Sequence, residues 1–140
     1  MTISLFIRVS CFGFSLGAAE SLESLLATIA YNLENRKWGS KYPIIMNDFY
    51  NGLIKKEQIE DALKELDTIE SGLSKIKADQ VVWVKCKELR HPSIVNNINQ
   101  YATNLAVYFK NPDGVNMITL IRNALKKGLN RNRDVTIFKV

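Results

Sequence analysis

The segment WGSKYPIIMNDFYNG, residues 38–52, is the most informative part of the chain. It gathers a tryptophan, three further aromatic residues and a proline around the polar pair Asn47 and Asp48, and it lies between two strong helical patterns. Pro43 suits the first turn of a short helix through Tyr50, because the N–H that proline lacks has no helical partner there. With Gly52 closing that helix, the segment predicts a shaped corner between two longer helices.

Helices are predicted on both sides of this corner. From about Ala18 to Asn35, apolar residues recur every three or four positions, as in a helix that faces a core. Residues 55–76 repeat the pattern with charged residues at the other positions, and at about 1.5 Å per residue they would span roughly 33 Å. The two apolar stripes are Leu22, Leu25, Leu26, Ile29, Ala30 and Leu33, then Ile59, Ala62, Leu63, Leu66, Ile69, Leu73 and Ile76.

Strand patterns lie further from the corner. Residues 2–9 alternate between apolar and other side chains, and residues 81–86, VVWVKC, are rich in β-branched and aromatic types. Helix spacing returns over residues 98–109 and from Met117 to Leu129, on either side of the turn-forming sequence NPDG at 111–114. Residues 135–140 predict a closing strand, which we expect to pair with the strand at the N-terminus.

These elements predict an α+β fold in one compact domain, residues 1–140, with a small sheet of about three or four strands covered by four or five helices. A chain of 140 residues with 46% hydrophobic and 24% charged residues suits one globular domain. Gly13 and Gly17 are expected in a turn between the first strand and the first helix. Strand order cannot be read from the sequence.

The N-terminal apolar run is interpreted as mature structure and not as a signal peptide, because its one basic residue, Arg8, lies inside the run. The run is too short to cross a bilayer, so no membrane segment is expected. Cys11 and Cys86 are the only cysteines, and free, buried thiols are favoured over a disulfide.

The residues indicate no reaction, so no catalytic residue, cofactor or metal site is predicted. His91, the only histidine, stands between Arg90 and Pro92 and is interpreted as part of a surface turn, because no nucleophile or carboxylate is placed to work with it. The glycines after the first strand match neither a dinucleotide fingerprint nor a phosphate-binding loop.

Charge is distributed unevenly along a chain whose formal net charge is +5. Six acidic residues fall within residues 57–70, whereas residues 110–139 hold seven basic residues against two acidic ones. Such asymmetry suits docking to a complementary protein, although a plain solvated surface explains it equally well. A small basic nucleic-acid-binding protein is the alternative function, carried by the run KKGLNRNR, but no recognisable nucleic-acid-reading motif accompanies it.

Several segments together resemble the immunity protein 70 family of bacterial polymorphic-toxin systems. They are residues 38–52 with the acidic helix after them, VVWV from Val81, the Asn96-Asn97-Ile98 element and YFKNPDG from Tyr108. The resemblance implies a cytoplasmic α+β protein without catalysis, which binds the C-terminal domain of a cognate secreted toxin and neutralises it. Inhibitors of basic nucleases are often acidic, and this chain is net basic, so the activity of the toxin stays open. A homo-oligomer also stays open.

Partner-binding residues are expected in two groups, since aromatic residues and nearby acids dominate binding hot spots and electrostatic steering. In the competing interpretation, Trp38, Pro43, Met46 and Phe49 simply fill the corner and Asp48 bonds nearby backbone. The expected residues are Trp38, Tyr42, Asp48 and Tyr50 in the corner, and Glu60, Asp61, Glu65 and Asp67 on the acidic helix.

Overall fold

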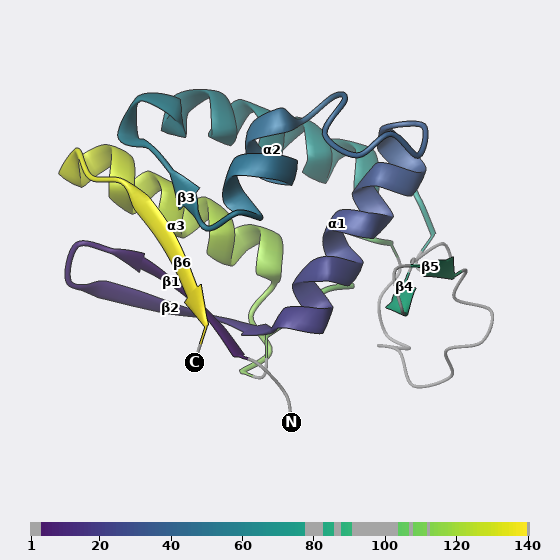
Figure 1. The fold of residues 1–140 in the computed structure, drawn as a ribbon, viewed down its shortest axis with the longest axis horizontal. Helices are drawn as coiled ribbons and strands as arrows, with labels where there is room; N and C mark the ends of the chain where they lie inside the picture. Colours follow the sequence, from purple (N-terminus) through teal and green to yellow (C-terminus); the bar gives the residue numbers. More distant parts are fainter. Residues whose placement is uncertain are drawn as a thin grey trace.

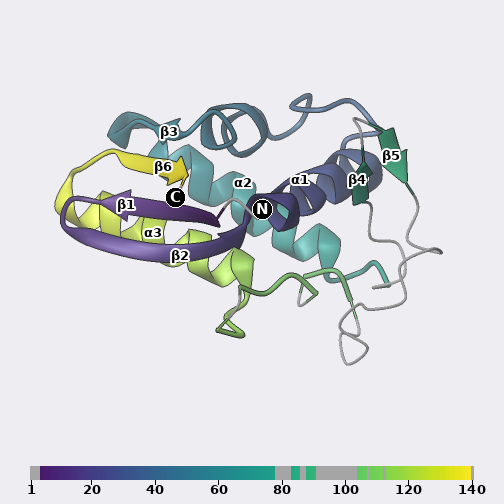
Figure 2. The same cartoon turned by 60° about the horizontal axis from the view of Figure 1, so that its bottom comes forward.

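A computed structural model describes residues 4–77, 83–85, 88–90, 104–106, 108–111 and 113–139. A four-stranded antiparallel sheet has the order β2-β1-β6-β3, and helices pack on one face of it (Figures 1 and 2). The predicted α+β class is confirmed. The strands of this sheet are β1 (Ser4–Val9), β2 (Phe12–Ala18), β3 (Leu53–Ile54) and β6 (Val135–Lys139). The helices of the described residues are α1 (Ala19–Leu33), the π-helix η1 (Ile44–Phe49), the short 3₁₀ turn η2 (Lys56–Gln58), α2 (Ile59–Leu73) and α3 (Met117–Arg131).

The first strand is followed by a second strand that the sequence did not predict. β1 and β2 form an antiparallel hairpin, and the expected turn around Gly13 and Gly17 is therefore wrong. The register of this pair shifts next to Leu5, opposite Gly17, whose φ of +110° suits glycine. Cys11 lies in the tight turn of the hairpin and is a free, exposed thiol, so the prediction that it is buried is also wrong.

The two ends of the chain pair in the middle of the sheet, as predicted. β1 and β6 are antiparallel, with Ile7 opposite Ile137 and Phe6 opposite Phe138. Leu5, Ile7 and Val9 are buried beneath the helices, whereas Phe6 and Arg8 point to the other face of the sheet.

The helices α1, α2 and α3 follow their predicted stripes, and α2 is shorter than predicted. α2 begins at Ile59 and not at residue 55, because the preceding residues form β3 and η2, where Gln58 Oε1 accepts from the backbone N–H of Lys55 at 3.1 Å. Its 15 residues span about 22 Å, which is shorter than predicted. At the start of α3, Asn116 Oδ1 accepts from the N–H groups of Ile118 and Thr119.

The helix predicted over residues 98–109 is not present where the structure describes this segment. Asn104 bridges to Lys77 and Lys110 bridges to Asn116, with turns between them. The rest of that helix, Cys86 and His91 lie outside the described residues. The strand predicted over residues 81–86 is observed as β4 (Trp83–Lys85), which pairs with β5 (Glu88–Arg90).

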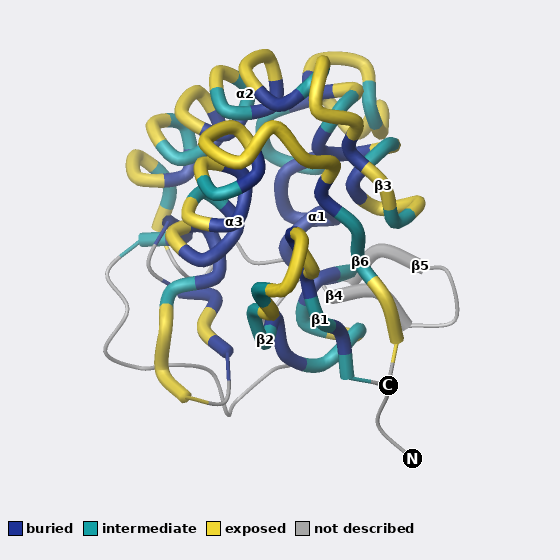
Figure 3. The backbone as a smooth tube through the Cα atoms, turned by 90° about the vertical axis from the view of Figure 1, so that its left-hand side faces the viewer, coloured by how far each residue is buried: buried dark blue, intermediate teal, exposed yellow. Residues whose placement is uncertain are grey.

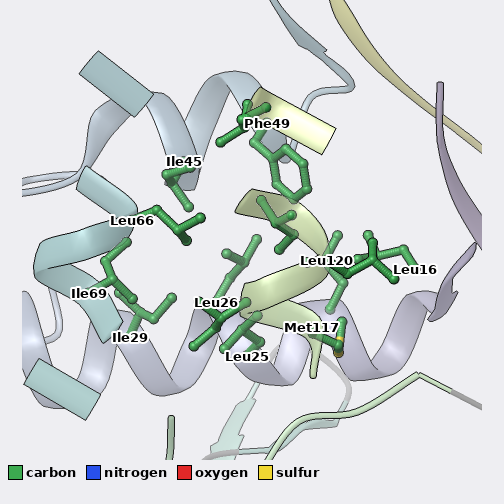
Figure 4. Close-up of a cluster of buried hydrophobic side chains, with 14 of the residues drawn as sticks. Leu16, Leu25, Leu26, Ile29, Ile45, Phe49, Leu66, Ile69, Met117 and Leu120 are labelled. Carbon is green, nitrogen blue, oxygen red and sulfur yellow. The ribbon is translucent and has the colours of Figure 1, made fainter. Parts of the chain in front are cut away.

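Among the described residues, one hydrophobic cluster joins the sheet to the helices. Figure 4 shows side chains from β2, α1, η1, α2 and α3 converging, among them Phe49, Leu66 and Met117, all of which are buried. The exposed residues of α2 lie on its outer side (Figure 3). In the described part of the chain, no helix has the length and apolar character needed to cross a membrane.

Candidate functional site

A buried carboxylate holds the loop at the start of the corner in place. Glu34, at the end of α1, is 3% exposed, and its side chain accepts three backbone N–H groups from the loop that follows. The donors are Gly39 at 3.1 Å, Lys41 at 2.8 Å and Tyr42 at 2.9 Å. A buried carboxylate is stable when hydrogen bonds replace its water, so Glu34 fixes the path of the loop into η1.

A second carboxylate binds the start of η1. Glu65 Oε1 of α2 accepts from the N–H groups of Ile44 at 3.1 Å and Ile45 at 3.0 Å. The pKa of Glu65 is raised: burial is the largest cause, the charges of Asp48 and Asp61 also raise it, and the two hydrogen bonds lower it in part. Glu65 was predicted to bind a partner, and in the structure its carboxylate joins α2 to the corner.

Trp38 and Tyr50 meet on the surface of the corner. Their ring centroids are 5.4 Å apart in an edge-to-face arrangement, and the indole N–H of Trp38 donates to the Met46 carbonyl at 2.9 Å. The Tyr50 hydroxyl lies 3.5 Å from Glu23 Oε1 of α1, and burial together with the Glu23 charge raises the pKa of Tyr50. The two rings are therefore held in place yet remain 39% and 45% exposed.

A pocket of about 360 Å³ begins at Tyr50 and reaches the end of the sheet. Phe138 of β6, 42% exposed, lines its far side and stacks on Phe6 at 6.0 Å between centroids. We call Trp38, Tyr50 and Phe138 the aromatic patch. These three residues are half of the large hydrophobic residues that are exposed in the described part of the chain. Concentrated apolar surface of this kind marks interaction sites.

The other corner residues take structural positions. Tyr42 is 4% exposed, and burial followed by the charges of Glu34 and Glu65 raises its pKa. Met46 and Phe49 are fully buried, as the corner-filling interpretation expects, whereas Pro43 is exposed. Asp48 accepts from the side chain of Gln58 at 3.1 Å.

The acidic residues of α2 divide between free and engaged side chains. Glu60 and Asp61 are exposed on its first turn. Asp67 is joined at 3.0 Å to Arg122 of α3, which also contacts Glu70 at 2.8 Å. The acid-rich residues 57–70 and the basic segment, residues 110–139, are therefore in contact through α2 and α3, and some of their charges are paired.

Two members of the basic segment pack against an aromatic ring. Lys127 Nζ and Arg131 Cζ lie 4.3 Å and 5.1 Å from the ring centroid of Phe12 on β2. In these cation–π contacts, the positive charges of Lys127 and Arg131 interact with a ring of the protein itself.

Sequence reasoning missed Glu34, Glu23 and Phe138. Phe138 had a usable signal, because in a strand with Val135 and Ile137 facing the core it must face outward. Glu34 had none, since its donors are backbone N–H groups of the following loop, which any residue type can supply. Glu23 had none, since Tyr50 comes from a distant segment. Within the described residues, no group of three histidine, cysteine or acidic side chains is placed to hold a metal ion.

Comparison with known proteins identifies the family. The model of the family Immunity protein 70 matches residues 7–137. None of the curated proteins and none of the solved structures matches the chain. The match includes the corner, α2, α3 and most of the four-stranded sheet, and the chain therefore belongs to the immunity protein 70 family.

Proposed function

We propose that this protein neutralises its cognate toxin by binding the toxin's C-terminal domain directly, without catalysis, in the cytoplasm of the producing cell. Membership of the immunity protein 70 family implies neutralisation of a cognate toxin. The single observation that supports direct binding is the aromatic patch, which is exposed although its rings are apolar and held in fixed positions.

The aromatic patch has the composition of a binding hot spot. Trp and Tyr are enriched among residues whose truncation weakens protein complexes by 2 kcal/mol or more. Because Trp38 and Tyr50 are restrained by the Met46 carbonyl and by Glu23, little side-chain freedom is left to lose on binding. The patch therefore supports a preorganised contact.

The exposed acids of α2 form the second part of the proposed interface. Glu60 and Asp61 are free to steer a basic surface of the toxin, while the carboxylates of Glu65 and Asp67 are engaged within the molecule. Of the residues expected from the sequence, we therefore assign direct contact to Trp38, Tyr50, Glu60 and Asp61, and we add Phe138 as the third member of the aromatic patch. Tyr42, Asp48, Glu65 and Asp67 support the shape of that surface.

Co-expression tests this proposal. The chain is produced with the toxin domain encoded immediately upstream, surviving cells are counted, and the lysate is separated by size exclusion. We expect rescue together with a co-eluting complex. Rescue without a complex would contradict direct binding, and unchanged toxicity would contradict the function itself.

Matched variants locate the contact. Tyr50→Ala should weaken the complex at least tenfold, whereas Leu129→Ala, which removes a similarly exposed apolar side chain from α3, should leave it unchanged. Equal affinities for the two variants would place the contact elsewhere.

A further inference from the structure

In the part of the chain that the structure describes, the sheet has an unpaired edge next to the pocket. β3 pairs with β6 only at Leu53–Thr136 and Ile54–Val135, and Gly52, with φ of +103°, turns the chain away toward η1. β6 continues past this point to Lys139, toward the start of α1 (Figure 1). Among the described residues, no strand pairs with Phe138 or Lys139 on the β3 side.

The backbone groups at this edge are those that a further strand would use. The N–H of Ile137 donates to the Gly52 carbonyl at 2.9 Å, so Ile137 presents its backbone groups to the β3 side. These groups alternate in direction along a strand, so the N–H and C=O of Lys139 face the same side. They face the edge where β3 has already ended.

The pocket lies directly beside this edge. Ile137, Phe138 and Lys139 line it from β6, Leu22 and Glu23 line it from α1, and Tyr50 to Gly52 close it. Its volume of about 360 Å³ falls in the range of sites that hold ligand groups, about 300–1,000 Å³. A strand paired with Lys139 would direct alternate side chains into this pocket.

Charge indicates which segment would fit. Glu23 lines the pocket from α1, and Glu20, three residues earlier, is its neighbour on the surface of the same helix. Neither forms an ion pair with a described residue. Lys139 lies on the opposite side. An occupant with a basic side chain toward α1 and an acidic side chain toward β6 would complement both. Lys139 also disfavours pairing with a second copy, because lysines at sheet edges discourage self-association.

We propose that the cognate toxin adds an extended segment to the edge of β6, as a continuation of β3, with an apolar side chain in the pocket and a basic side chain beside Glu20 and Glu23. The inference rests on the proposed function and specifies how the aromatic patch is used. Strand addition of this type takes affinity from main-chain hydrogen bonds and specificity from pockets for alternate side chains.

Amide hydrogen exchange tests the open edge in the native chain. The ¹⁵N-labelled protein is measured alone and in complex with the unlabelled toxin domain. We expect exchange of the Lys139 amide to slow at least tenfold in the complex, because its N–H gains a backbone partner. A complex in which this amide exchanges as in the free protein would overturn strand addition and leave toxin binding intact. Failure to form any complex would overturn both proposals.

A matched pair of variants gives an independent test. Lys139→Pro removes the N–H at the edge, whereas Lys139→Ala removes only the side chain, and proline is tolerated at a strand edge whose N–H faces solvent. We expect Lys139→Pro to bind the toxin domain about tenfold or more weakly than Lys139→Ala, with matched thermal unfolding. Equal affinities, or slow exchange at Lys139 in a dimer of the free chain, would overturn the proposal.

Discussion

Replacing Glu34 by alanine should destabilise the protein more than any other change to a single acidic side chain in the corner. The substitution leaves the backbone N–H groups of Gly39, Lys41 and Tyr42 without their acceptor. A buried donor that loses its partner costs about 1–3 kcal/mol. Because the loop can partly turn toward water, we expect about 1 kcal/mol for each donor, and a total near 3 kcal/mol.

Glu34→Gln keeps the size and shape of the side chain and changes its hydrogen bonds, so it measures the effect of the hydrogen bonds on the free energy of unfolding. The amide keeps one acceptor oxygen and turns an NH₂ group toward a backbone donor, so about half of the loss, 1–2 kcal/mol, is expected. Against a typical domain stability of about 5–15 kcal/mol, both losses are measurable.

Urea unfolding followed by tryptophan fluorescence measures these free energies. The slope of the unfolding free energy against urea concentration should be the same for the variants and the native protein. An unchanged slope would mean that the substitution alters the stability of the native state and not the surface exposed on unfolding. Glu20→Ala, at an exposed position of the same helix, is the control and should remain within about 0.5 kcal/mol of the native protein. A free energy of unfolding for Glu34→Ala within that same margin would show that the three hydrogen bonds do not stabilise the corner.

Three further predictions concern the framework of the site. The pKa of Glu65 is raised, so the folded state holds this proton more tightly than the unfolded chain, and this contribution to stability is lost as pH rises from 4.5 through the folded pKa. The stability of the native protein relative to Glu65→Gln should therefore fall over that range in urea titrations; a difference that rises with pH would contradict this. Gly52→Ala should lower the free energy of unfolding by about 1–3 kcal/mol, because φ is +103° and the added Cβ would lie 3.3 Å from the Ile137 carbonyl oxygen. Gly13→Ala, which meets nothing within 4 Å, is its control in thermal unfolding, and equal losses would argue against strain. Arg122→Ala should lower stability by about 1 kcal/mol or less, and less still in 1 M salt, because its partner Asp67 is 70% exposed; a salt-independent loss would point to packing instead.

The helices and strands that were predicted correctly are those whose own residues show a clear hydrophobic period. α1, α3, β1 and β6 each place apolar residues on one face with a clear period, and Pro43 indicated the start of η1. β2 was missed because Gly13 and Gly17 resemble a turn, whereas the sheet uses them within a paired strand next to a bulge. The helical spacing near Leu105 was misleading because a bridge to Lys77 holds this segment instead.

The α+β class and the corner at residues 38–52 could be predicted from the amino-acid pattern, because periodicity and local turn chemistry act over a few residues. The family was indicated separately, by the resemblance of several short segments. The strand order, the burial of Glu34 and the position of Tyr50, Phe138 and Glu23 around one pocket became known from the three-dimensional fold. The strand order and the pocket depend on which distant segments pair. Residues that separate elements contribute to one pocket are not spaced periodically along the chain, so no sequence pattern indicates them.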